Sequence, residues 1–236
     1  MPASATTLPK YIQISERLIR DIAAGHLADG ARLPPERDMA DSLGLSVGTL
    51  RKALAVLADK GLLDRVQGSG NYIRHVPGVA SVYGFLRLEL RGGGGLPTAR
   101  VLAVDRLPKP DDAPAFGPDA AAWRIRRLRR LDGQAVAVEE IWLDAARAAR
   151  LDAGDLSESL YLHYRDRLGL IIASVEDRVG LRTVPDWAPS DFAPMAGAAC
   201  AHVTRLSRDT SGARVEFSRT WFDSDKARYI SRMGKG

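Results

Sequence analysis

The sequence predicts an α/β protein of two domains, a small helical domain followed by a larger strand-rich domain with an antiparallel sheet. Apolar residues recur at helical spacing through the first third of the chain and then alternate in period two. A segment with proline and glycine, residues 75–80 (HVPGVA), separates the two patterns. The length of 236 residues is sufficient for two domains of ordinary size. We therefore expect domains at residues 8–75 and 81–232.

The first domain is expected to contain three helices and a hairpin. Apolar spacing predicts a helix from about Lys10 to Ala24. A second helix begins after Pro34 and Pro35, and a third follows Ser46, which is a suitable N-cap. Residues 62–73 predict two strands around a glycine-rich turn. The buried stripe of the third helix is expected to be Leu50, Ala53, Leu54 and Leu57.

Small or hydrogen-bonding residues are left at the start of the third helix and in the turn of the hairpin. Such a helix can enter the major groove of DNA, and such a turn can lie along the phosphate backbone. Between Ser46 and Arg74 there are five basic and two acidic residues, so positive charge is concentrated locally. The candidate DNA-binding residues are Ser46, Gly48, Thr49, Arg51, Lys52, Gln67, Gly68, Ser69 and Gly70.

The run PPERDMADSLGLSVGTLRKALAVLADKGLL, followed by VQGSGNYI, resembles the winged helix-turn-helix of the GntR family of bacterial transcription regulators. The resemblance implies a DNA-binding domain and a phosphate contact by Arg37. The alternative for Arg37 is a surface charge or a partner for Asp41. The family usually has arginine directly after the N-cap residue, where this chain has Val47. The alternative for the whole domain is a helical domain that binds no DNA.

The second domain is expected to be mainly strands. Its features RLRRLDGQAVAVEEIWL, SLYLHYRDRLGLIIASVEDRV and LSRDTSGARVEFSRTWFD, in that order, resemble the UTRA domain of the HutC subfamily within GntR. The resemblance implies an effector-binding α+β domain of chorismate-lyase-like fold. Period-two alternation predicts strands at residues 100–107, 123–143, 170–179 and 200–222, and short helices are expected at about 156–167 and 190–198.

Strand parity places two arginines among apolar side chains. One face of a strand carries Trp123, Ile125, Arg127, Arg129 and Leu131. A buried arginine is costly unless an anion or another acceptor pairs with it, and its planar donor fork suits a carboxylate or phosphate. Arg127 and Arg129 are therefore predicted to bind an anionic effector, and the UTRA resemblance implies the same role. The alternative is a structural pair with Glu139 or Glu216.

The register of the next hairpin decides whether Glu139 lies beside these arginines. Asp132 and Gly133 indicate a two-residue turn, which would place Arg127 opposite Val138. A three-residue loop with Gly133 in a bulge would place Arg127 opposite Glu139 instead. Because the resemblance places Glu139 in the effector site, we favour the bulge.

The UTRA resemblance implies four further effector-binding residues, Phe85, Ser159, Tyr161 and Glu216. Ser159 begins a helix whose N-terminus can bind an anion, and Ser159 and Tyr161 supply hydroxyl groups. The alternative for Phe85 is ordinary core packing.

The expected function is a ligand-responsive transcription regulator, a repressor released from its operator by a small anionic metabolite. One recognition helix per chain favours a homodimer on a near-palindromic site in double-stranded DNA. The alternative is a chorismate-lyase-like enzyme with an appended DNA-binding domain, although the second domain shows no paired nucleophile and base. No cofactor and no metal site are expected, because His163 and His202 have no companions at ligand spacing. A single cysteine, no membrane-length apolar run and no apolar signal core predict a cytoplasmic protein without membrane contact.

Overall fold

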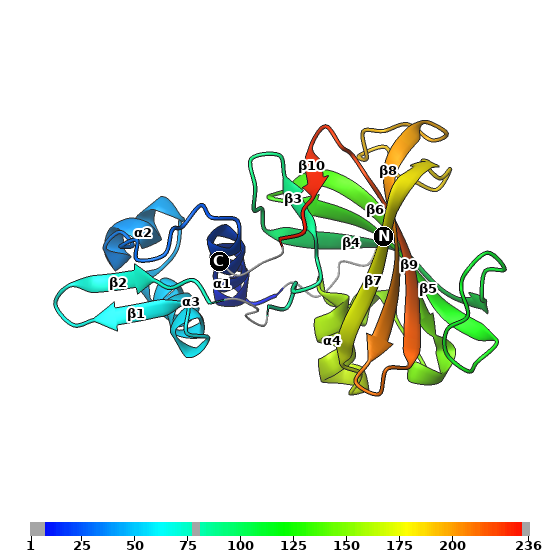
Figure 1. Cartoon of the computed structure of the whole chain (residues 1–236), viewed down its shortest axis with the longest axis horizontal. Coiled ribbons are helices and arrows are strands. Elements are labelled where there is room, and N and C mark those ends of the chain that lie inside the picture. The colour runs from blue at the N-terminus through cyan, green and yellow to red at the C-terminus, as the bar shows by residue number, and fades with distance from the viewer. Residues whose placement is uncertain (1–7, 77–80, 233–236) are drawn as a thin grey trace. The chain divides into compact units, whose positions relative to one another are not determined.

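The computed structural model describes residues 8–76 and 81–232 and divides into two compact units (Figure 1). The N-terminal unit contains residues 8–96 together with the described residues from 229 onward. The second unit contains residues 97–228. Residues 81–96 therefore group with the N-terminal unit, although the sequence analysis assigns them to the second domain. Most of the expected connecting segment, residues 77–80, lies outside the described residues.

The N-terminal unit contains the three expected helices and the hairpin. Its elements are α1 (Lys10–Ala23), α2 (Glu36–Ser42), α3 (Val47–Asp59), β1 (Leu63–Val66) and β2 (Gly70–Ile73). The Ser46 side chain caps α3 by accepting a hydrogen bond from the Thr49 amide at 3.1 Å. The predicted stripe of α3 is buried in one core with apolar residues of α1. This packing leaves the start of α3 at the surface.

The hairpin depends on two glycines with positive φ. β1 and β2 pair antiparallel from Leu63 opposite Ile73 to Val66 opposite Gly70. Gly68 has φ 75° and Gly70 has φ 129°, and these are backbone conformations that residues other than glycine rarely adopt. A Cβ at Gly70 would also lie 3.1 Å from Arg32 Nε. The hairpin therefore requires glycine at these two positions for their backbone conformation.

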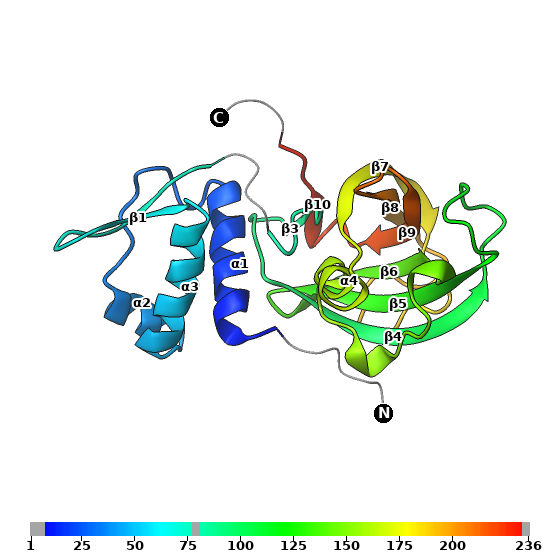
Figure 2. The ribbon, with the colours of Figure 1, turned by 90° about the horizontal axis from the view of Figure 1, so that it is seen from below.

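The second unit is built on one six-stranded antiparallel sheet, in the order β4-β5-β6-β9-β8-β7. Tyr161 of α4 (Leu160–Leu168) bonds to residues of β8 and β9, so this helix lies against one face of the sheet (Figure 2). The strands are β4 (Pro97–Pro108), β5 (Ala121–Leu131), β6 (Gln134–Asp144), β7 (Ile172–Thr183), β8 (Ala199–Asp209) and β9 (Arg214–Phe222). The 3-10 turns η1 (Ala145–Arg147) and η2 (Ala153–Asp155) also belong to this unit. The short strand β3 (Leu88–Leu90) belongs to the N-terminal unit, and β10 (Ala227–Tyr229) spans the boundary at residue 228.

The two predicted helices of the second unit have different outcomes. The first begins at Leu160 rather than near residue 156, because Ser159 is its N-cap. The helix expected at residues 190–198 is wrong, since this segment forms only turns and bends. Pro194 lies inside this segment and lacks the N–H that a helix interior requires. Phe192 nevertheless packs into an apolar core with side chains of the sheet.

The β5–β6 hairpin confirms the predicted register and corrects its explanation. Arg127 lies opposite Glu139, as expected. The loop, however, has two residues, Asp132 and Gly133, with φ 45° and 79° as a type I′ turn requires. The extra residue is Val136 of β6, since Arg129 pairs with Ala137 and Arg130 with Ala135. The bulge therefore lies inside the strand rather than at Gly133.

Candidate nucleic-acid interface and effector site

The expected DNA-binding residues lie at the surface of the N-terminal unit. In the helices, Arg37, Ser46, Gly48, Arg51 and Lys52 are exposed, and Thr49 is half-buried. The Thr49 hydroxyl lies 2.8 Å from the Ser46 hydroxyl, so these two side chains share the cap of α3. At the turn of the hairpin, Gln67 and Gly68 are exposed, while Ser69 and Gly70 are half-buried. The Ser69 hydroxyl is engaged with the Tyr72 hydroxyl at 2.7 Å.

Arg51 is positioned by a neighbouring helix. Its Nε donates to Glu36 Oε2 at 2.6 Å, while its side chain remains 66% exposed. This hydrogen bond lowers the pKa of Glu36, so the carboxylate keeps its charge at neutral pH. The sequence analysis missed Glu36, because it lies fifteen positions away on α2. Glu36 thus orients Arg51, an exposed donor of α3, within the free chain.

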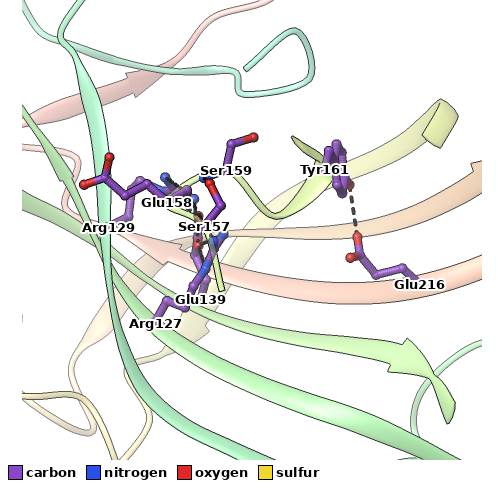
Figure 3. A network of polar contacts seen from close by, with 8 residues as sticks. All are labelled: Arg127, Arg129, Glu139, Ser157, Glu158, Ser159, Tyr161 and Glu216. Carbon is purple, nitrogen blue, oxygen red and sulfur yellow. Dashed lines mark hydrogen bonds and ion pairs between the residues drawn. The ribbon is translucent and has the colours of Figure 1, made fainter. Parts of the chain in front are cut away.

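In the second unit, Arg127 and Arg129 of β5 converge on Glu139 of β6 (Figure 3). Arg127 donates from Nε and Nη2 to Glu139 Oε2 at 3.0 and 2.6 Å. Arg129 donates from Nε to Oε1 at 3.0 Å and from Nη2 to Oε2 at 3.2 Å. The exposed fractions are only 4% for each arginine and 6% for the glutamate. Arg127 and Arg129 therefore form the structural pair with Glu139 that is the alternative in the sequence analysis.

Electrostatics keep this cluster of Arg127, Arg129 and Glu139 charged. Burial alone would raise the pKa of Glu139, but the two adjacent guanidinium groups outweigh it and lower the pKa to about 2. Burial lowers the pKa of Arg127, whereas the charge of Glu139 opposes that shift. The carboxylate is therefore ionised throughout the physiological pH range.

One backbone carbonyl group before α4, that of Glu158, completes the hydrogen bonding of the arginine cluster. Arg127 Nη1 and Arg129 Nη1 both donate to the Glu158 carbonyl, at 3.4 and 3.3 Å. Glu158 is buried and immediately precedes Ser159, whose hydroxyl accepts a hydrogen bond from the Leu162 amide as the helix cap. Ser159 is one of the effector-binding residues expected from the sequence. Glu158 is not among them, because it acts through its backbone carbonyl, which no side-chain pattern indicates. The cluster thus joins two strands to the start of a helix.

Tyr161 and Glu216 form a second polar group, separate from the arginines in Figure 3. The Tyr161 hydroxyl lies 2.8 Å from the Ser207 hydroxyl and donates to Glu216 Oε1 at 3.0 Å. Ser207 also donates to that oxygen, at 2.9 Å. Burial raises the pKa of Glu216, although hydrogen bonds from hydroxyl groups, including that of Tyr164, act in the opposite direction. Burial also raises the pKa of Tyr161. This group can offer hydrogen bonds to an uncharged polar part of a ligand.

Phe85 does not lie in the same compact unit as the other effector candidates. It is half-buried in a turn of the N-terminal unit, whereas the arginine cluster, Ser159, Tyr161 and Glu216 belong to residues 97–228.

No helix among residues 8–76 and 81–232 is long and apolar enough to cross a membrane. Within those same residues, no group of three or more His, Cys, Asp or Glu side chains could hold a metal ion.

Comparisons with known proteins agree with this architecture. Residues 10–73 match the model of the bacterial regulatory proteins of the gntR family, and residues 93–228 match that of the UTRA domain. HTH-type transcriptional regulator SmoD of Agrobacterium fabrum is 56% identical over 99% of this chain and 100% of its own length. HTH-type transcriptional repressor NagR of Bacillus subtilis is 22% identical over 97% of this chain and 96% of its own.

Solved structures show the same fold. The possible transcriptional regulator YydK of Bacillus subtilis aligns over 96% of this chain and 100% of its own, with a TM-score of 0.55 and 20% identity. PhnF of Mycobacterium smegmatis aligns over 92% of this chain and 97% of its own, with a TM-score of 0.51 and 20% identity.

A winged helix with an exposed recognition helix, followed by a ligand-binding domain, defines a ligand-responsive DNA-binding transcription regulator and not an enzyme. The chain belongs to the GntR family of bacterial regulatory proteins and carries a C-terminal UTRA domain.

The exposed donor of α3 generates the first prediction. Arg51→Ala is expected to weaken operator binding, and, if Arg51 contacts a phosphate, to reduce the slope of log affinity against log salt by about one. The measurement is a fluorescence-anisotropy titration of operator DNA over a range of salt concentrations. Arg17→Ala, which removes another exposed arginine that pairs with an aspartate on α1, is the matched control. Unchanged affinity and slope in Arg51→Ala would contradict the role.

The buried cluster generates the second prediction. Glu139→Gln keeps the shape of the side chain and leaves two buried guanidinium groups without their shared counter-charge. We expect a loss of about 3–5 kcal/mol in the free energy of unfolding. The measurement is urea denaturation followed by tryptophan fluorescence, because all four tryptophans lie in the second unit.

The contribution of Glu139 to the free energy of unfolding decreases as the pH falls. The pKa of Glu139 falls from an ordinary 4.5 to about 2 on folding, so its stabilisation is complete above about pH 4.5 and is lost as the pH falls toward 2. The stability difference between wild type and Glu139→Gln should therefore shrink across that window. Glu176→Gln, at a side chain that is 48% exposed, should show little difference at any pH. A constant difference for Glu139→Gln between pH 5 and 2 would exclude this account.

Proposed function

We propose that this regulator is a homodimeric repressor of HutC type, which a small anionic effector releases from a near-palindromic operator in the bacterial cytoplasm. The effector binds at the cluster of Arg127, Arg129 and Glu139. The observation that carries the proposal is the convergence of two buried guanidinium groups on one carboxylate at the start of α4.

The arrangement suits a ligand that carries a carboxylate or phosphate together with hydroxyl groups. Each guanidinium offers a planar fork of donors, and an anion can share or replace Glu139 as their acceptor. The adjacent N-terminus of α4 favours negative charge as well. The hydroxyl groups of Tyr161 and Ser207, with Glu216, can bind ligand hydroxyls. In this proposal Ser159 contributes through the helix start.

One relative supports this class of ligand by its printed name. The mannosyl-D-glycerate transport/metabolism system repressor MngR of Escherichia coli is 24% identical over 94% of this chain. Glycerate bears a carboxylate, and mannosyl bears hydroxyls, which are the two kinds of group that the site of this chain can bind. Repression is also the activity in the printed name of NagR.

On the DNA side, the proposal assigns base and phosphate contacts to the start of α3 and phosphate contacts to the turn of the hairpin. Support comes from the exposure of Gly48, Arg51 and Lys52, from Arg37 on α2, and from the exposed tip at Gln67 and Gly68. Two such surfaces in a dimer multiply the specificity of one.

The third prediction separates effector binding from DNA binding. A thermal-shift panel of small carboxylates, sugar phosphates and glycerate glycosides first identifies a ligand, since saturation at a hundred times its Kd adds roughly 2.7 kcal/mol of stability. Arg127→Ala should then abolish the release of operator by that ligand, while operator affinity without ligand stays within about twofold, because no DNA contact is lost. Arg127→Lys should rescue poorly, because an ammonium group lacks the planar fork.

Arg126→Ala is the matched control, because Arg126 is the adjacent arginine of β5 and pairs with Glu140 on the opposite face of the sheet. It should respond normally to the ligand. Effector affinity that is unchanged in both Arg127→Ala and Arg129→Ala would place the effector site elsewhere.

A further inference from the structure

A third extended segment lies beside the hairpin of the N-terminal unit. The amide of Leu33 donates to the Asn71 carbonyl at 2.9 Å, and Arg32 forms an isolated antiparallel bridge with Tyr72 of β2. Residues 31–33 therefore run along one side of β2, while β1 pairs with its other side. These backbone contacts fix the place of Arg32 relative to the hairpin.

The side chain of Arg32 lies against the base of the hairpin turn. A Cβ added at Gly70 would lie 3.1 Å from Arg32 Nε, 3.5 Å from Nη2 and 3.7 Å from Cζ. A side chain at position 70 would therefore crowd the guanidinium group. The sequence shows no sign of this contact, because Arg32 precedes α2 and lies far from Gly70 along the chain.

The charge of Arg32 is not balanced within the described part of the chain. Arg32 is exposed, and no acidic side chain among the described residues pairs with it. Arg74, at the end of the same hairpin, is instead paired with Asp64 at 2.6 Å. Arg32 thus presents an uncompensated guanidinium group beside the turn.

We propose that Arg32 binds a phosphate of the DNA backbone next to the hairpin turn. This inference rests on the proposed contact of that turn with phosphates, and it adds a residue from outside the hairpin. A guanidinium group offers several N–H donors in one plane, which suits the oxygens of a phosphate. Its place is held by the backbone of residues 31–33, so little conformational freedom is lost when a phosphate binds.

The place of the guanidinium group favours a phosphate over a base edge. The hairpin projects from the three helices (Figure 1), and its exposed tip carries Gln67 and Gly68. Arg32 lies at Gly70, behind this tip. When the tip meets the DNA, the backbone that borders the groove is nearer to Arg32 than the floor of the groove. Contacts of this kind position a protein on the duplex without reading its sequence.

Salt dependence tests the contact without knowledge of the operator. Binding of the full chain to a random-sequence duplex is measured by fluorescence anisotropy over a range of salt concentrations. Arg32→Gln removes the charge and keeps much of the side chain. We expect the slope of log affinity against log salt to fall by about one, and the affinity at about 0.1 M salt to fall about five- to tenfold. Arg32→Lys should keep most of the slope, because it keeps the charge.

Arg17→Gln is the matched control. It removes the same charge from another exposed arginine, on α1, and should leave the slope unchanged. The thermal midpoint of Arg32→Gln, followed by circular dichroism, should equal that of the wild type, because the lost group is at the surface. A wild-type slope in Arg32→Gln would overturn the contact.

Two further duplexes, one rich in A·T pairs and one rich in G·C pairs, distinguish a phosphate from a base edge. A phosphate contact predicts that Arg32→Gln loses the same factor in affinity for both. A loss confined to the A·T-rich duplex would indicate a contact with base edges in the minor groove, and would overturn the phosphate assignment.

Gln67→Glu separates this inference from the proposed docking of the hairpin turn. The change places a negative charge at the exposed tip, so it should weaken binding to the random-sequence duplex. If Gln67→Glu weakens binding and Arg32→Gln does not, only the role of Arg32 is overturned. If neither change weakens binding, the proposed contact of the turn with phosphates is overturned as well.

Discussion

Two buried guanidinium groups that share one carboxylate connect the main parts of the second unit. Charges are expensive to bury unless they are paired and fully hydrogen-bonded, and the cluster of Arg127, Arg129 and Glu139 meets this condition within the protein. It links β5 to β6, and through the Glu158 carbonyl it links both strands to the start of α4. A ligand that competes for these donors acts on three segments at once, which gives an effector site a direct way to alter the structure around it.

Strand parity could predict part of this cluster from the sequence. Alternation alone placed Arg127 and Arg129 on the apolar face of their strand, and both are buried. The family resemblance predicted that Glu139 lies opposite Arg127. It did not predict the position of the bulge that produces this register. The extra residue is Val136, and a bulge inside a strand leaves no mark in side-chain type. The missing helix at residues 190–198 shows that apolar spacing is weak evidence for a helix where a proline, Pro194, lies inside the segment.

In the DNA-binding unit, features that depend on nearby residues in the sequence could be predicted, whereas contacts between distant residues could not. The Ser46 cap, the apolar stripe of α3 and the glycine turn each depend on neighbours within a few residues, and each is present. The bond between Arg51 and Glu36 joins two helices, and no spacing rule indicates it. The contact of the two arginines with the Glu158 carbonyl is likewise a product of three-dimensional assembly. Both contacts form only in the folded chain.

The central claim is that effector and operator bind to the same molecule with opposing preferences. Thermodynamic linkage then requires that saturating operator weakens effector binding by the same factor by which saturating effector weakens operator binding. Isothermal titration calorimetry of the identified ligand, with the chain free and with the chain saturated by operator DNA, measures one factor, and an operator titration with and without ligand measures the other. We expect two equal factors, each larger than one. An effector affinity that is the same with and without operator would contradict this linkage.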